Sequence, residues 1–211
     1  HGRDVRSRAE MALDANGRIL ALRVRSHAND GAYASGVGVA IQLLIGPWVT
    51  TSVYDIATID LQLTAVLTNT APTGAYRGAG RPEAIYLIER LMDEAARVTG
   101  IARTEIRRRN MIRPDQMPYA NPMAQTYDSG KFESVMEQGL ALAEAFFAAS
   151  RDGDLQRLGA MLAADVSFHA DGGGKRPAVM HPILGYDAVM QLHAGLATFF
   201  GRQRSELVRT A

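Results

Sequence analysis

Residues 68–84 are Thr-Asn-Thr-Ala-Pro-Thr-Gly-Ala-Tyr-Arg-Gly-Ala-Gly-Arg-Pro-Glu-Ala, and the character of the chain changes across them. Before this stretch apolar residues alternate with a period of two, as in residues 59–69, which predicts β-strands. After it, apolar residues from 83 to 99 recur at helical spacing, and Pro82 suits the first turn of a helix. The stretch is therefore predicted to be a loop that joins a mainly β part, reaching to about residue 70, to a series of helices.

The order of these patterns predicts an α+β fold. Before the loop, Asn16-Gly17 is a strong signal for a two-residue hairpin turn, and residues 30–38 are predicted to form a glycine-rich loop. The expected strands are residues 9–14, 18–25, 49–54 and 59–69. Gly100 suits the end of the helix that follows the loop, and Asp154 is a good N-cap for a later one. The other expected elements are helices over 104–110, 131–150, 155–163 and 186–200, short strands over 166–170 and 182–184, and an extended loop over 113–130.

Residues 74–81, Gly-Ala-Tyr-Arg-Gly-Ala-Gly-Arg, have the chemistry of an anion or cofactor site. Glycines let backbone N–H groups approach a ligand closely, and the start of a helix favours an anion. Arg77 and Arg81 add planar donors that suit phosphate or carboxylate. The alternative is a tight strand-to-helix turn whose arginines pair with Glu83 or Glu89. The glycine spacing fits neither the dinucleotide fingerprint nor the Walker loop.

The same loop closely resembles the active-site loop of the molybdenum hydroxylase large subunits, the family of xanthine dehydrogenase, aldehyde oxidase and carbon monoxide dehydrogenase. The resemblance covers residues 1 to about 143. Besides the loop, the segments that carry it are His1-Gly-Arg-Asp, Asn29-Asp-Gly-Ala-Tyr, the expected helix 85–99, Arg107-Arg-Arg-Asn-Met-Ile and Tyr127-Asp-Ser-Gly-Lys-Phe. It implies a partial molybdopterin-binding domain over residues 1–143. The implied enzyme oxidises or hydroxylates aldehydes, N-heterocycles or similar small substrates.

This resemblance also implies a cofactor, in which molybdenum is bound to a pterin dithiolene beside the loop. The implied cofactor-binding residues are Gly74, Ala75, Tyr76, Arg77, Gly78, Ala79, Gly80 and Arg81. Arg77 is the best side-chain candidate among them. The copper-linked carbon monoxide dehydrogenases have a cysteine where this chain has Gly78, so oxidation by their copper–sulfur route is not expected here. Purine-hydroxylating members place an aromatic residue where this chain has Ala79, which argues against purine stacking.

No residue of this chain is assigned as the catalytic base. In the resembled family that base is a glutamate far toward the C-terminus of a much longer chain, and further cofactor-binding loops lie outside this segment too. Glu83 and Glu89 are expected helix residues rather than bases. The resemblance therefore implies a fragment that is not competent alone, and whose electrons leave through FAD-binding and iron–sulfur subunits or domains.

The last third of the sequence resembles a different family. Residues 144–175 are similar to a SnoaL-like domain of the NTF2-like fold, most of all to the C-terminal extension of certain extracytoplasmic-function sigma factors. Those extensions carry the same turn, Asp171-Gly-Gly-Gly-Lys, and Pro182-Ile-Leu-Gly-Tyr-Asp-Ala-Val continues the pattern. We expect a partial SnoaL-like domain over residues 144–211. The alternative functions are a regulatory or ligand-binding module with an oxidoreductase relic in front, or a fusion gene product without activity.

Polar side chains in this part also invite a metal or acid–base interpretation. They are His169, Asp171, Lys175, His181 and His193. Their spacing is not that of a zinc site, so we predict no metal there. In the sigma-factor extensions the turn from Asp171 to Lys175 looks regulatory. A small-ligand pocket near His169 and Asp171 is the further alternative.

Composition excludes several classes of protein. The 23 basic and 22 acidic side chains leave a formal charge of +1, so no electrostatic footprint for nucleic acid is expected. The chain contains no cysteine, which excludes disulfides, a thiolate nucleophile and iron–sulfur ligation by its own side chains. No apolar run approaches the roughly 18–20 residues of a membrane span. We therefore expect a soluble, cytoplasmic chain that begins within a longer sequence and self-associates through incomplete cores.

Overall fold

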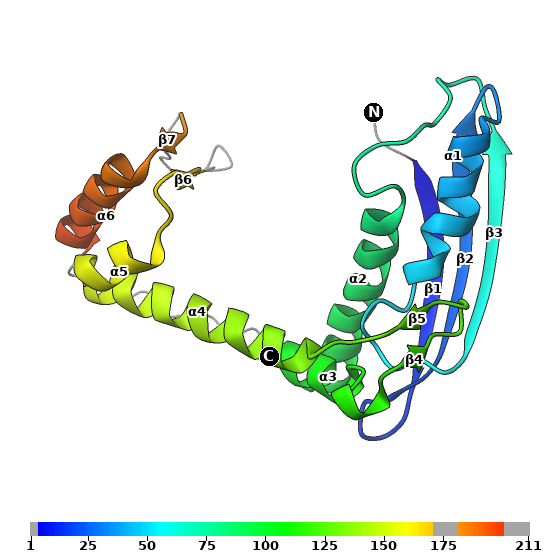
Figure 1. The fold of residues 1–211 in the computed structure, drawn as a ribbon, viewed down its shortest axis with the longest axis horizontal. Helices are drawn as coiled ribbons and strands as arrows, with labels where there is room; N and C mark the ends of the chain where they lie inside the picture. The colour runs from blue at the N-terminus through cyan, green and yellow to red at the C-terminus, as the bar shows by residue number, and fades with distance from the viewer. Residues whose placement is uncertain (1–3, 171–180, 201–211) are drawn as a thin grey trace. The chain divides into compact units, whose positions relative to one another are not determined.

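The computed structural model describes residues 4–170 and 181–200, and contacts divide the chain between Ser134 and Val135 into two units (Figure 1). We call residues 4–134 the N-terminal unit and the described residues from 135 onward the C-terminal unit. The division falls inside one helix, α4 (Phe132–Asp152). The domain boundary expected between residues 143 and 144 lies in the same helix and stays a prediction.

A mixed three-stranded sheet forms one layer of the N-terminal unit. Its strands are β1 (Val5–Leu13), β2 (Ile19–Gly31) and β3 (Ile59–Leu67), in the order β1-β2-β3. The β1–β2 pair is antiparallel, whereas β2 and β3 are parallel. Parallel neighbours need a crossover rather than a hairpin. The chain therefore has to return along the sheet between Gly31 and Ile59.

That crossover corrects the sequence prediction. It contains α1 (Gly36–Ala40), a π-helical turn η1 (Ile41–Ile45) and a 3₁₀ turn η2 (Pro47–Val49). The expected strand over residues 49–54 is wrong, because these residues form turns and only Tyr54 makes an isolated bridge, to Met111. Their β-branched side chains suit a strand, but the crossover geometry overrides that local preference. The expected loop over 30–38 also ends in a helix, which Ser35 caps.

Helices cover one face of this sheet. Figure 1 shows α2 (Arg81–Thr99) alongside β1, and α3 (Arg103–Asn110) follows it. Gly100 ends α2 in a left-handed conformation and donates its N–H to Ala96 O, as expected. The buried core lies between sheet and helices. Its residues are Ile19, Leu22, Val24, Tyr54, Ile56, Ile88, Met92, Ala95, Ala96 and Ile106. Each large apolar side chain buried there contributes about 1.5–3 kcal/mol to folding.

The turn between β1 and β2 is longer than the predicted two-residue hairpin. It spans residues 14–18, and Asp14 N–H donates to Arg18 O at 2.9 Å. Gly17 has a φ of +78°, and a Cβ there would lie 2.6 Å from Ile101 Cδ1. Asn110 secures the turn from α3, because its side chain accepts from Ile19 N–H and donates to Gly17 O. The predicted turn at Asn16-Gly17 is confirmed, and its predicted length of two residues is wrong.

The remainder of the N-terminal unit is mostly irregular, as predicted for 113–130. A 3₁₀ turn, η3 (Pro114–Gln116), precedes a short hairpin of β4 (Tyr119–Ala120) and β5 (Thr126–Tyr127). Asn121 organises the hairpin by accepting from Met123 N–H and Gln125 N–H. Its amide also donates to Trp48 O, which ties the hairpin to the crossover.

The C-terminal unit follows the predicted order of elements. Beyond α4 it holds α5 (Leu155–Met161), β6 (Ser167–Phe168), β7 (Ile183–Leu184) and α6 (Tyr186–Phe200). Asp154 caps α5 as expected, accepting from Arg157 N–H at 2.9 Å. Ala149, Leu158 and Val189 are its buried apolar residues. In the described parts of the chain, no helix is long and apolar enough to cross a membrane.

Candidate functional site

The loop before α2 is held at its start by the end of β2. Asn29 Oδ1 accepts from Thr68 Oγ1 at 2.7 Å and from Gly31 N–H at 2.9 Å. Main-chain bonds join Thr68 N–H to Gly31 O and Ala32 N–H to Thr70 O, both at 2.9 Å. A Cβ on Gly31 would lie 2.5 Å from Ala71 O, so only glycine permits this approach. We call these contacts, together with those of Thr73 below, the first anchor.

Asp30 and Thr73 complete the first anchor. Thr73 donates its N–H to Asp30 O at 3.3 Å and its hydroxyl to Asp30 Oδ1 at 3.1 Å. Thr73 O accepts from Ser35 Oγ at 3.0 Å, and the same hydroxyl caps α1 by accepting from Gly38 N–H. Asp30 is 1% exposed, and its Oδ2 is buried with no hydrogen-bond partner among the described atoms. The strand end, the helix start and the loop therefore meet at Thr73.

A second anchor holds the other end of the loop. Gly78 and Gly80 have φ values of +87° and +89°, and Ala79 between them also has a positive φ. Arg81 N–H donates to Gly78 O at 3.0 Å, which closes the turn that starts α2. A Cβ on Gly80 would lie 3.1 Å from Gly46 Cα, so this turn packs directly on the crossover. Gly78 and Gly80 thus serve the chain's own packing.

Between the anchors lie four exposed residues, Gly74, Ala75, Tyr76 and Arg77. Tyr76 is 78% exposed. A Cβ on Gly74 would meet nothing within 4 Å, so the space beside the Gly74 backbone is open. The predicted residues Gly74–Arg81 form one continuous segment, which we call the arginine loop. All of them are exposed except Ala79, which is half-buried, and Gly80, which is buried.

The two arginines of this loop carry its charge. Arg77 and Arg81 are exposed, and neither forms an ion pair within residues 4–170 and 181–200. The start of α2 adds few hydrogen-bond donors for an anion, because Pro82 has no N–H and Arg81 N–H is already bonded. Arginine side chains, rather than free helix N–H groups, are thus the donors that this loop offers to an anion.

Glu89 belongs to a structural network instead of pairing with these arginines. It accepts from Tyr54 Oη at 2.7 Å and from Arg107 Nε at 2.9 Å, and Arg107 also contacts Asp93. Burial, with the hydrogen bond to Glu89, raises the pKa of the Tyr54 hydroxyl well above its usual value. This network ties the crossover, α2 and α3 together. The alternative in which Glu89 neutralises the arginine loop is wrong.

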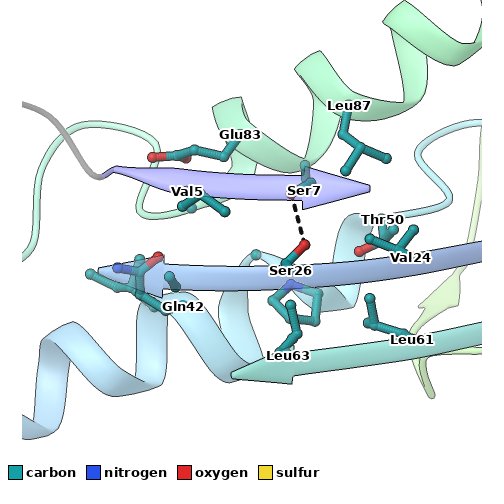
Figure 2. A pocket seen from close by; sticks show the side chains of 16 residues that line it. Val5, Ser7, Val24, Ser26, Gln42, Thr50, Leu61, Leu63, Glu83 and Leu87 are labelled. Atoms are coloured by element: carbon teal, nitrogen blue, oxygen red, sulfur yellow. Dashed lines mark hydrogen bonds between the residues drawn. The ribbon is translucent and has the colours of Figure 1, made fainter. Parts of the chain in front are cut away.

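A cavity of about 60 Å³ lies beside the second anchor, between the sheet, the crossover and the start of α2 (Figure 2). Leucine and valine side chains form much of its wall, and Glu83 and Gln42 contribute polar groups. Ser7 Oγ and Ser26 Oγ lie 2.7 Å apart at one side of it. The space suits a few water molecules and is too small for an organic cofactor. The arginine loop, not this cavity, is the candidate site.

The C-terminal candidates form no comparable site. Asp171 and Lys175 lie outside the described residues. His193 lies edge-on to Phe146 and Phe168, with both ring centroids 6.1 Å away, and burial lowers its pKa. Among the described residues, no group of three or more potential ligands could hold a metal. An apolar hollow of about 310 Å³ is lined by Gly139, Leu142, Ala143, Phe146, Phe147 and Met161, and not by His169 or His181.

The sequence predicted no role for any side chain of the first anchor. Asn29, Asp30, Gly31 and Ala32 lie in one segment that carries the resemblance, and Thr68, Thr70 and Thr73 lie in the loop 68–84 that carries it too. Ser35 and Thr73 carried no signal of their own, because their partners are distant in sequence. One signal was available for Asp30, since residues 31–54 contain no charged side chain and Asp30 begins that apolar stretch.

Comparison with known proteins supplies the family context. The family described as the molybdopterin cofactor-binding domain matches residues 1–111. Subunit gamma of the 6-hydroxypseudooxynicotine dehydrogenase complex of Paenarthrobacter nicotinovorans is 33% identical over 139 residues, which are 64% of this chain and 17% of that protein. The carbon monoxide dehydrogenase large chain of Hydrogenophaga pseudoflava is 36% identical over 141 residues, 65% of this chain and 17% of that protein.

Solved structures are also similar to this chain. Quinoline 2-oxidoreductase from Pseudomonas putida 86 is similar with a TM-score of 0.63 and 32% sequence identity, covering 74% of this chain and 20% of that one. The chain therefore spans about a fifth of the length of the relatives it matches. The match of the family ends at residue 111, so the resemblance of residues 144–211 to a SnoaL-like domain stays a prediction.

Proposed function

Because the chain belongs to the molybdopterin cofactor-binding domain family, we propose that its arginine loop forms part of the cofactor site of a molybdenum-dependent hydroxylase or dehydrogenase large subunit. The substrates proposed are aldehydes, N-heterocycles or similar small molecules. The chain contains no cysteine, so it binds no iron–sulfur cluster through its own thiolates.

The observation that carries this proposal is an exposed pair of arginines held between two rigid contacts. Thr73 is hydrogen-bonded to Asp30 on one side, and Gly80 packs on Gly46 on the other. Arg77 stands in the exposed part between them, without an ion pair in the described chain. Unpaired guanidinium groups on a fixed backbone suit an anionic ligand.

The exposed arginines of this loop fit a molybdenum–pterin group, because that group carries anionic parts. Arg77 and Arg81 would hold its anionic parts, and Gly74 leaves the backbone open to a close approach. When bound, that group supplies the metal centre at which a substrate carbon is oxidised. The chain's own contribution is to bind and orient the group from one side.

We do not propose that this chain catalyses a reaction by itself. General-base catalysis needs a positioned base within hydrogen-bond reach, and Glu89 is committed to Tyr54 and Arg107. Subunit gamma of the Paenarthrobacter dehydrogenase is by its name one member of a complex. We propose that this chain likewise acts beside FAD-binding and iron–sulfur subunits or domains, which remove the electrons.

For residues 144–211, the second candidate function is a SnoaL-like regulatory or ligand-binding module. The apolar hollow between α4 and α5 suits a small apolar ligand, and residues on both sides of position 144 line it: Gly139, Leu142 and Ala143 before it, and Phe146, Phe147 and Met161 after it. The remaining alternative, a fusion product without activity, would give neither cofactor binding nor ligand binding. Titration of the chain with candidate apolar ligands, followed by Phe146→Ala as a lining variant, separates the two.

The experiment for the main proposal uses the complete large subunit that carries this segment. Arg77→Ala should lower molybdenum retention or turnover far more than Arg103→Ala. Arg103 is a suitable control, because it is an exposed arginine of α3. Its Nε lies 3.7 Å from Asp93 Oδ1, away from the arginine loop. Equal effects of the two substitutions would remove the arginine loop from the cofactor site.

A further inference from the structure

We propose that Asp30 is a positioning residue, which acts through Thr73 to fix the conformation in which the arginine loop meets its ligand. The purpose assigned to that loop rests on the proposed function. The contact itself belongs to this chain and can be tested without any cofactor.

Asp30 is a charged group in an unusual place. It is 1% exposed, at the boundary of a 24-residue stretch, 31–54, that contains no charged side chain. Burial of a carboxylate is costly unless hydrogen bonds compensate for the lost water. Only Oδ1 has such a bond, from Thr73, while Oδ2 has none among the described atoms. A buried carboxylate kept at this cost points to a role beyond packing.

Thr73 is the only loop residue that Asp30 binds, and it is bound completely. Its N–H and hydroxyl donate to Asp30, and its carbonyl accepts from Ser35. Residues 74–77 follow at once and are exposed. The turn at 78–80 is fixed as well, where Ala79 N–H donates to Tyr76 O. The path of Arg77 is therefore set by two fixed ends, of which Asp30 and Ser35 hold the first.

This arrangement explains why one buried carboxylate matters to an exposed arginine. If Thr73 is released, four residues between the anchors gain freedom, and the guanidinium of Arg77 samples many positions. A ligand would then have to order the loop on binding, which lowers its affinity. Asp30 thus pre-organises the loop without touching the ligand.

Trypsin gives a direct readout of loop freedom in the 211-residue chain. It cleaves after Arg77, and cleavage after Arg151 in the C-terminal unit serves as an internal reference. Thr73→Val removes the hydroxyl while keeping the shape, Thr73→Ser restores it, and Thr64→Val is a matched control at an exposed position of β3. Asp30→Ala removes the other partner.

We expect Thr73→Val to speed cleavage after Arg77 about tenfold relative to cleavage after Arg151, as for the loss of one hydrogen bond to a charged group. Thr73→Ser and Thr64→Val should stay within about twofold of the unmodified chain. Asp30→Ala should match Thr73→Val, and the double variant should be no faster, because both remove one interaction.

Three results would overturn the proposal. The rate of cleavage after Arg77 stays unchanged in Thr73→Val, cleavage after Arg77 and after Arg151 accelerates equally, or the effects of the two substitutions add. Joint acceleration would mean that the pair stabilises the fold as a whole. If the ratio changes as expected but added molybdopterin gives Arg77 no protection from trypsin, the proposed function fails and the positioning role stands.

Discussion

Gly46 and Gly80 meet backbone to backbone, and a Cβ on Gly80 would lie 3.1 Å from both the Cα and the N of Gly46. The two residues come from the crossover and from the turn that starts α2. Their contact explains why a glycine-rich sequence precedes the helix, because any larger residue would push the turn off the crossover. It also fixes one end of the arginine loop.

Replacement of Gly80 by alanine tests this contact. The new Cβ would lie 2.8 Å from Ile41 O at a φ of +89°, so both crowding and backbone strain oppose it. We expect a loss of about 2 kcal/mol or more in the free energy of unfolding, measured by urea denaturation. Gly74→Ala is the control, since its Cβ meets nothing within 4 Å. Equal stability of the two variants would contradict the packing described here.

Tyr54 should contribute to stability through its hydroxyl as well as its ring. Tyr54 is 1% exposed and donates to Glu89, which Arg107 also binds. Tyr54→Phe should lower the free energy of unfolding by about 1.5–3 kcal/mol, as for a hydrogen bond to a charged group. Tyr33→Phe, at a residue 75% exposed, should change it by less than about 0.5 kcal/mol. If Tyr54→Phe left the free energy of unfolding unchanged, the network of Tyr54, Glu89 and Arg107 would be dispensable for stability.

His193 should make the stability of the C-terminal unit depend on pH. Burial lowers its pKa in the folded state, so below the unfolded value of about 6.5 the unfolded chain binds more protons than the folded chain. Stability contributed by neutral His193 is therefore present above that pH and is lost as the pH falls toward the lowered folded pKa.

The measurement is the melting temperature at pH 7.5 and at pH 5.5. Unfolding is monitored with a probe placed in the C-terminal unit. The decrease on acidification should be smaller in His193→Gln than in the unmodified chain. His181→Gln, at an exposed histidine, should leave the decrease unchanged. A decrease that is the same in all three chains would show that His193 does not couple folding to protonation.

The isolated 211-residue chain should not turn over aldehydes or purines. It offers cationic groups in the arginine loop, but no base is assigned, and it has no cysteine for electron-transfer clusters. The assay supplies molybdopterin and an artificial electron acceptor to the purified chain. Sustained, molybdenum-dependent oxidation of an aldehyde would overturn this prediction.

Local signals predicted the helices well and the crossover poorly. The helix expected over 186–200 is present as Tyr186–Phe200, because periodicity and chain length are local properties. Residues 49–54 looked like a strand, since threonine and valine favour strands, but their place in the crossover makes them turns. Nothing local reveals that β2 and β3 are parallel neighbours, and that arrangement is what requires a crossover.

The candidate site was predictable to a similar extent. Glycine and arginine content, together with the family resemblance, drew attention to residues 74–81, and the structure leaves Gly74–Gly78 and Arg81 exposed. Asp30 and Thr73 lie 43 residues apart, and no spacing rule connects such a pair. The structure was needed to show that a buried carboxylate holds the start of the loop.

The central claim is that Arg77 binds the molybdenum–pterin cofactor, and the dissociation constant of molybdopterin for a large subunit restored to full length around this segment tests it most directly. Equilibrium dialysis of the unmodified subunit, Arg77→Ala and Arg103→Ala gives three values to compare. We expect Arg77→Ala to weaken binding about tenfold or more, as for the loss of a charge-assisted contact, and Arg103→Ala to change it less than about twofold. Identical dissociation constants for the two variants, or no binding by the unmodified subunit, would contradict the account.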